Sequence, residues 1–211
     1  MAPDEPDLAA LTGSRICHDL ASPIGAALTG LEFVSGAPGG GAPEDMALLR
    51  DSLTGARATL AMLRTAFARA GGAKARDAGA LGDIVRDHLA ARPRLRLDWA
   101  LRGTLAPATQ QHIALAILCA VQALPRGGTL ALTHAGQDGI HLAATPAATG
   151  ALAADPALWD GLTGLAALPA ADPRQVEFHL LAARIARGDA RIEVSRDDQT
   201  LSITLLGRGR D

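Results

Sequence analysis

Apolar residues near the N-terminus recur in alternating steps of three and four. One series comprises Met46, Leu49, Leu53, Ala56, Leu60, Leu63, Phe67 and Ala70. An earlier series with the same rhythm comprises Cys17, Leu20, Ile24, Ala27, Leu31 and Val34. This spacing is typical of the apolar seams of coiled coils and helical bundles. The pattern predicts a helical hairpin over roughly residues 7–71, with its turn in the intervening stretch rich in glycine and proline.

Two helices with narrow apolar seams cannot enclose a core by themselves. Either the hairpin packs on the rest of the chain, or two hairpins join as a four-helix bundle. A sustained heptad fits a bundle better than it fits a sheet, so we predict a homodimer.

The pattern changes after a segment rich in glycine and alanine at residues 71–80. We therefore expect a hairpin domain over residues 1–76 and a second domain over residues 77–211. In the second domain Leu95, Leu97, Trp99 and Leu101 alternate with polar residues, which predicts a half-buried strand. Further strands are predicted at 129–135, 139–145, 190–196 and 200–206, and helices at 80–91, 107–124, 155–165 and 173–187. The fold class is α+β, with a mostly antiparallel sheet and helices on one face.

Bulk properties narrow the classes of function. The chain has 211 residues and a formal net charge of −2, which argues against a general nucleic-acid binder. Its longest unbroken apolar stretch, near residues 113–120, is far shorter than the roughly 20 residues of a membrane-spanning helix. The acidic N-terminus lacks the basic region of a secretory signal, and two cysteines suit a reducing compartment. We expect a cytoplasmic protein with no membrane or nucleic-acid partner.

His18 carries the strongest chemical signal. On the predicted first helix it lies one step off the apolar seam, and the small residues Ser22 and Gly25 share its face. An exposed imidazole without bulky neighbours suits in-line phosphoryl transfer, because the phosphoryl donor must approach to bonding distance. Asp19 can accept a hydrogen bond from one ring nitrogen and leave the other as the nucleophile. We favour His18 and Asp19 as a catalytic pair, with His18 phosphorylated, over the alternative of an ordinary surface histidine.

A partner surface is expected around this pair. Its candidate residues are Arg15, Ala21, Ser22, Gly25, Ala26, Arg57 and Arg64. Arg50, Arg57 and Arg64 recur every seven residues beside the second seam, where they could meet an acidic pocket on a partner. The alternative, a solvated flank of ion pairs worth about 0–1 kcal/mol each, stays open.

The remaining histidines show no metal-ligand spacing, so we expect no metal site. They are His88, His112, His134, His141 and His179.

The sequence resembles a known family at two places. His18-Asp19-Leu20-x-x-Pro23 matches the H-box of the dimerisation and phosphotransfer domains of histidine kinases. The closer resemblance is to ChpT-like histidine phosphotransferases of alphaproteobacteria, in which a similar Cys-His-Asp-Leu segment opens the chain and Ala-Leu-Pro-Arg-Gly-Gly, here residues 123–128, ends the central helix of the next domain. The resemblance extends over residues 8–206. It implies a dimeric four-helix bundle followed by a histidine-kinase-like ATPase (Bergerat-type) α/β sandwich.

The nucleotide-binding motifs of that ATPase fold are missing. Its magnesium-binding asparagine positions fall on Leu115 and Cys119, and neither side chain is a ligand for a hard cation. Residues 145–150 replace the Asp-x-Gly-x-Gly motif, and no Gly-x-Gly precedes the last helix. Glycine-rich loops are what let backbone amides cradle phosphates. We therefore expect no bound cofactor and no use of ATP.

The resemblance implies a histidine phosphotransferase in a multistep two-component phosphorelay, in which His18 shuttles phosphate between receiver-domain aspartates. The implied partners are a second copy of the chain and the receiver domains of a hybrid histidine kinase and of response regulators, a cell-cycle regulator among them. Any Mg²⁺ would belong to the receiver. Two alternatives remain: a divergent histidine kinase that binds ATP, and a scaffold for response regulators whose His18 is never phosphorylated.

Overall fold

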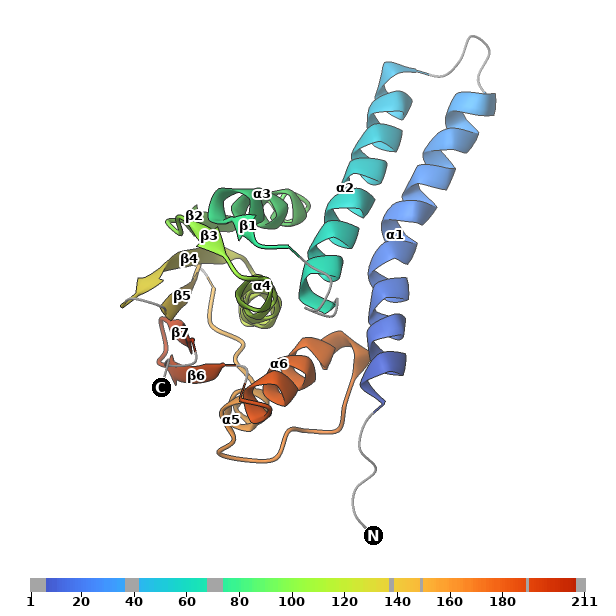
Figure 1. Ribbon diagram of the computed structural model, residues 1–211. Helices are drawn as coiled ribbons and strands as arrows, with labels where there is room; N and C mark the ends of the chain where they lie inside the picture. The colour runs from blue at the N-terminus through green and yellow to red at the C-terminus, as the bar shows by residue number, and fades with distance from the viewer. Residues whose placement is uncertain are drawn as a thin grey trace.

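The computed structural model describes residues 7–36, 42–67, 74–136, 139–148, 150–188 and 190–207. Two long helices, α1 (Leu8–Gly36) and α2 (Pro43–Phe67), form an antiparallel hairpin beside a second body of mixed helix and strand (Figure 1). The predicted hairpin is confirmed. Ala70 of the predicted seam, residues 37–41 of the turn and residues 71–73 of the boundary segment lie outside the described residues. None of the described helices is both long and apolar enough to cross a bilayer.

Small residues let the two hairpin helices approach closely. A Cβ placed on Gly30 would lie 3.4 Å from the Cβ of Leu49, and Ala27 and Ala58 are buried nearby along the hairpin. Pro23 lies inside α1, and the helix continues through it to Gly36.

The hairpin leaves broad apolar surface uncovered, mostly on its outer half. Eight of its large apolar side chains are each at least 40% exposed in the single chain: Ile24, Leu28, Leu31, Phe33, Met46, Leu48, Leu53 and Leu60. Most of them belong to the seams predicted from the heptads. The inner end of α2 differs, because Met62, Leu63 and Ala66 are buried against the second body.

The second body contains a five-stranded sheet with the order β2-β4-β5-β7-β6. The strands are β2 (Leu95–Trp99), β4 (Gly128–Ala135), β5 (Gly139–Pro146), β6 (Arg191–Arg196) and β7 (Leu201–Leu206). Only the β2–β4 pairing in this sheet is parallel. The α+β class and each predicted strand are confirmed. The pattern missed a short antiparallel pair, β1 (Arg76–Asp77) with β3 (Thr104–Leu105), because two-residue strands carry no periodicity.

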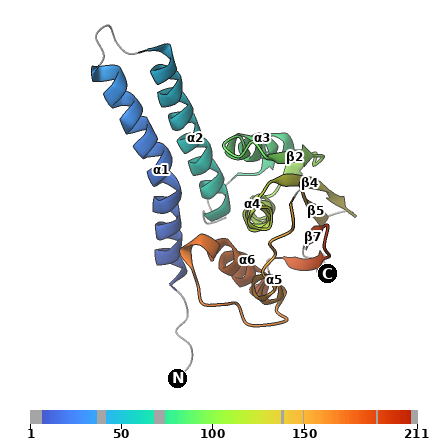
Figure 2. The ribbon, with the colours of Figure 1, turned by 180° about the vertical axis from the view of Figure 1, so that it is seen from behind.

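Four helices lie on the side of the sheet that faces the hairpin (Figures 1 and 2). They are α3 (Ala78–Leu89), α4 (Pro107–Gln122), α5 (Pro156–Thr163) and α6 (Val176–Ala186). The predicted helix at 173–187 begins as a 3₁₀ turn, η2 (Pro173–Gln175), before α6. Aspartates begin three of these segments, since Asp77, Asp155 and Asp172 each accept a hydrogen bond from a backbone amide two residues later.

Helix α4 lies at the centre of the core. Every residue from 110 to 120 is buried, because α4 contacts the sheet on one side and α2 and α6 on the other. The hairpin and the second body therefore share one hydrophobic core. The predicted boundary between residues 1–76 and 77–211 stays a prediction.

A glycine turn joins α4 to the sheet. Gly127 adopts a φ of +94°, and the Gly128 amide donates to the Arg94 carbonyl at 2.9 Å. A Cβ on Gly127 would overlap that carbonyl oxygen. The Pro-Arg-Gly-Gly sequence therefore sets the start of β4 beside the start of β2.

We expect Gly127→Ala to destabilise the protein more than Gly103→Ala does. Both glycines have positive φ, but a Cβ on Gly103 meets nothing within 4 Å. The Gly103 variant should lose only the cost of a left-handed residue, about 1 kcal/mol. Denaturant unfolding of the two variants measures the difference, and equal losses would show that the contact with Arg94 is unimportant.

Candidate functional site

His18 projects from the third turn of α1 into solvent. Its side chain is 59% exposed, as the phase of the heptad predicts. Ala21, Ser22, Gly25 and Ala26 are all exposed along the same stretch of helix, and a Cβ on Gly25 would meet nothing within 4 Å. A bulky group can therefore reach the ring without displacing part of this chain.

Asp19 engages one nitrogen of the ring. Its Oδ1 lies 3.1 Å from Nδ1 of His18, and its side chain is 19% exposed. A carboxylate only accepts hydrogen bonds, so this contact favours the tautomer with hydrogen on Nδ1. The lone pair of Nε2 is then available to an incoming electrophile.

The structure places Arg15 differently from the expected partner surface. Its side chain is only 11% exposed, and its Nε donates to Oδ2 of Asp19 at 2.8 Å. Its Nη1 donates to the carbonyl of Arg174 at 2.6 Å and lies 3.8 Å from Oε1 of Glu177. The guanidinium is thus used within the chain, because α1 lies directly over η2 and the start of α6.

Cys17 also departs from its expected place. The seam places it inside the hairpin, but the thiol side chain is exposed, whereas its neighbour Ile16 packs against the core. The first half of α1 faces α6 and η2 as well as α2, and this second contact turns the buried face by one residue.

The arginines of α2 lie on the hairpin beside the His18 segment. Since Gly30 lies against Leu49 in the antiparallel hairpin, Arg57 and Arg64 lie at the level of that segment. Arg57 and Arg64 are exposed, and Arg50, closer to the hairpin turn, is also exposed. Whether they contact a partner stays a prediction.

A hollow of about 180 Å³ adjoins the histidine. Its lining comprises Ser14, Arg15 and His18 of α1 and Asp172, Pro173 and Arg174 of the second body. Sequence reasoning missed the last three, because nothing in their local pattern indicates that α1 lies beside them.

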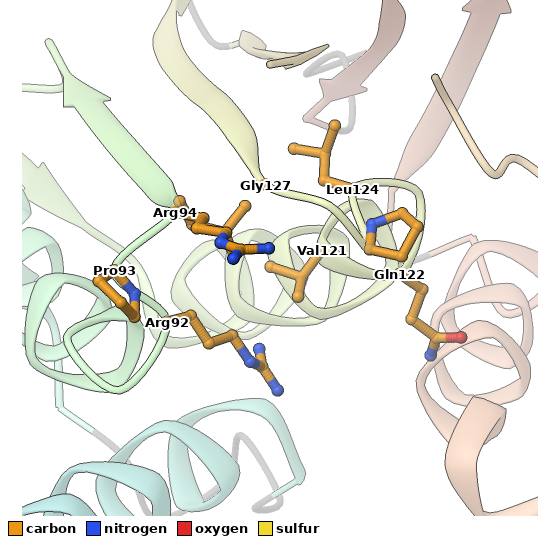
Figure 3. Close-up of a pocket in the computed structure, with 9 residues that line it drawn as sticks. Arg92, Pro93, Arg94, Val121, Gln122, Leu124 and Gly127 are labelled. Carbon is orange, nitrogen blue, oxygen red and sulfur yellow. The ribbon is translucent and has the colours of Figure 1, made fainter. Parts of the chain in front are cut away.

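A larger cavity of about 540 Å³ opens between the α3–β2 connection and the end of α4 (Figure 3). Arg92 and Arg94 line it together with the apolar side chains of Val121 and Leu124. Its described lining includes no carboxylate to hold a divalent cation, so its charge suits an acidic group rather than a metal ion. No cluster of three or more metal-ligating side chains occurs in the residues that the structure describes.

His88 lies within electrostatic range of Asp19. It is buried on α3, and neither ring nitrogen has a hydrogen-bond partner among the described residues. Loss of hydration on burial, and then the charge of Arg92, lower its pKa to about 4, although Asp19 acts in the opposite direction. His88 is therefore neutral near pH 7 and serves as a packing residue.

Comparison with known proteins decides the family. The family described as "Histidine phosphotransferase C-terminal domain" matches residues 79–200, which is more than half of the chain. The chain belongs to the ChpT-like histidine phosphotransferase family. The matched residues lie within the second body, whereas His18 and Asp19 lie outside the match, so the roles of these two residues remain predictions.

The chain is also similar to individual proteins and solved structures. The protein phosphotransferase ChpT of Brucella abortus (strain 2308) is 38% identical over 135 residues, which are 63% of this chain and 63% of the Brucella protein. A solved bacterial phosphotransferase aligns over 94% of this chain and 95% of its own, with a TM-score of 0.74 and 25% identity. The histidine kinase AdeS of Acinetobacter baumannii aligns over 92% of this chain and 98% of its own, with a TM-score of 0.46 and 15% identity.

We expect acid to destabilise the protein through His88. Histidine in the unfolded chain takes up a proton near its ordinary pKa of 6.5 and His88 in the folded chain only near 4, so stability is complete above pH 6.5 and falls as pH drops toward 4. The loss should approach about 3 kcal/mol at most, at 1.36 kcal/mol for each unit of pKa difference. Urea unfolding across this range should show a flatter pH dependence for His88→Leu than for wild type. Identical slopes would contradict the prediction.

Proposed function

We propose that this protein carries a phosphoryl group on His18 between the aspartates of receiver domains in a multistep phosphorelay, without using ATP. The observation that carries the proposal is the exposed His18 ring, 59% accessible, with Nδ1 held by Asp19. Membership of the histidine phosphotransferase family supports the same class of reaction. We also propose a cytoplasmic location, where receiver domains of this kind operate.

The transfer needs little from this chain besides an oriented nucleophile. Nε2 of His18 attacks the phosphorus of the donor's aspartyl phosphate; the N–P bond forms, and the P–O bond breaks to leave the donor carboxylate. The Nδ1 proton stays in place, so the ring acquires positive charge that the Asp19 carboxylate stabilises. The reverse sequence passes the phosphoryl group to the acceptor aspartate. Mg²⁺, supplied by the receiver, would offset the phosphoryl charge.

The packing of α4 supports independence from ATP. Leu115 and Cys119 are both fully buried in the core, at the positions where a kinase would present asparagines. Burial raises the pKa of the Cys119 thiol well above its usual value, so it stays a neutral packing group. After β5 the chain returns directly onto this helix, since the Ala153 amide donates to the Ala123 carbonyl at 3.0 Å.

Charge supports a receiver as the partner. The phosphorylation pocket of a receiver is acidic, and Arg57 and Arg64 stand at the level of His18. Complementary charge at such a rim chiefly speeds the encounter. No such argument favours nucleic acid, given the net charge of −2.

The uncovered face of the hairpin supports a homodimer. Met46, Leu53 and Leu60 recur every seven residues on α2 and remain exposed, as do Ile24 and Leu31 on α1. Heptad stripes of this kind are covered when a second hairpin completes a four-helix bundle. The dimer would carry two phosphorylatable histidines.

The decisive test is transfer of labelled phosphate from a phosphorylated receiver domain of a hybrid histidine kinase. We expect the wild-type protein to gain acid-labile label and His18→Ala to gain none, because the nucleophile is absent. The matched control His134→Ala changes an exposed histidine on β4 and should become labelled as wild type does.

Two other outcomes would overturn this assignment. Label acquired from ATP and magnesium with no receiver present would identify a kinase. A wild-type protein that no receiver labels, although it binds them, would identify a scaffold.

We expect Leu53→Glu to dissociate the dimer, because it would bury an unpaired carboxylate in the bundle. The dissociation constant should rise more than about tenfold, which is about 1.4 kcal/mol. Leu165→Glu is the matched control, since Leu165 is 82% exposed and lies outside the hairpin. Light scattering over a dilution series measures both variants. A wild-type monomer, or a Leu53 variant as dimeric as the control, would contradict the bundle.

A further inference from the structure

A buried carboxylate of the second body lies under the site on α1. Glu177, in the first turn of α6, has no exposed surface. Its Oε1 accepts a hydrogen bond from the Gln122 amide and lies 3.8 Å from Nη1 of Arg15, whereas its Oε2 has no hydrogen-bond partner within the described part of the chain. Burial raises its pKa, and the charge of Arg15 opposes that rise. Burying a carboxylate costs desolvation free energy, so its presence here needs an explanation in the groups that it contacts.

Arg15 connects this carboxylate to the site. The guanidinium is 11% exposed and makes contacts on two sides: with Glu177 and the Arg174 carbonyl of the second body, and with Oδ2 of Asp19 on its own helix. An exposed pair of residues four apart on a helix contributes little and holds no fixed geometry. Here the contacts to the second body fix the guanidinium, which in turn fixes one oxygen of Asp19.

The other oxygen of Asp19 connects this set of polar contacts to His18. Oδ1 lies 3.1 Å from Nδ1 of His18, so a continuous set of polar contacts runs from α6 to the ring. Without the charge of Glu177, the single carboxylate of Asp19 would have to compensate the whole charge of Arg15. Arg15 would then compete with His18 for that carboxylate, and the hydrogen bond to Nδ1 would weaken.

We propose that Glu177 is a positioning residue for His18, acting through Arg15 and Asp19 to keep hydrogen on Nδ1 and the lone pair of Nε2 outward. This inference rests on the proposed phosphotransfer function. It assigns to the second body a role in preparing the histidine of the hairpin. A residue that acts through other side chains changes the rate of transfer by orienting the nucleophile rather than by binding the partner.

A purely structural role for Glu177 would predict a different result. If the carboxylate only fastens α6 to α1, its removal lowers stability and leaves the imidazole tautomer unchanged. The tautomer of His18 in the unphosphorylated protein therefore separates the two roles, and it can be read whether or not a receiver is known.

The experiment is ¹⁵N NMR of the imidazole in the full-length protein with labelled histidine, at a pH where the ring is neutral, with His18→Ala to assign the signal. In wild type we expect the Nδ1–H form to predominate. In Glu177→Gln, which keeps the side-chain shape but removes the charge, we expect the Nε2–H share to increase. Glu193→Gln, a glutamate on the distant edge strand β6, is the matched control and should leave the tautomer unchanged.

The kinetic arm uses phosphorylated receiver at saturating concentration. Transfer to Glu177→Gln should slow by at least about threefold, with the concentration for half-maximal rate unchanged, because orientation and not binding is altered. Arg15→Lys provides a second variant should Glu177→Gln fold poorly. A lysine cannot reproduce the planar guanidinium contacts, so it should shift the tautomer in the same direction.

A folded Glu177→Gln with the wild-type tautomer and wild-type transfer would overturn the inference and leave the phosphorelay function intact. The same result in folded Arg15→Lys would do so if the first variant cannot be studied. Conversely, an altered tautomer in a protein that no receiver phosphorylates would preserve the positioning role and reject the phosphotransfer function.

Discussion

The geometry of the candidate site depends on one largely buried guanidinium. Arg15 lies between α1 and the start of α6, where it is bonded to carboxylate or carbonyl oxygen on both sides. Removing a guanidinium from water is unfavourable unless its donors are satisfied, so this arrangement requires both bodies to lie as they do. The hairpin and the second body are also joined by the apolar core around α4, to which the last turns of α2 contribute Met62, Leu63 and Ala66. Polar and apolar contacts thus fix the same relative orientation.

The two ends of the hairpin serve different purposes. The inner end is packed against α3, α4 and α6, whereas the outer end presents leucines and methionine to solvent. His18 lies on the inner half of α1 but on a face that neither neighbour covers. One face of the hairpin is buried in its own chain; in the proposed function a second face would pack on another copy and a third would stay free for a partner that brings phosphate.

The centre of the second body is filled by packing residues of α4. Leu115 and Cys119 fill the core, and the chain after β5 is hydrogen bonded to the end of α4. Near the site this body instead supplies Glu177, Gln122 and the Arg174 carbonyl, and cations at Arg92 and Arg94. These groups suit the orientation of a side chain and contact with acidic surfaces.

The amino-acid pattern alone determined the elements and the exposure of the histidine. The spacing of apolar residues and the positions of glycine and proline are local properties of the sequence. The heptads therefore predicted both hairpin helices, and the alternation at Leu95–Trp99 predicted β2. The position of His18, one residue from the apolar seam, predicted that its side chain is exposed. Only the tertiary structure decided whether Arg15, Cys17 and Glu177 are buried or exposed. Arg15 looks like a surface cation, Cys17 like a seam residue and Glu177 like the ordinary acid of a first helical turn. Their burial or exposure follows from α6 lying against α1, a contact between residues about 160 positions apart that no local pattern encodes.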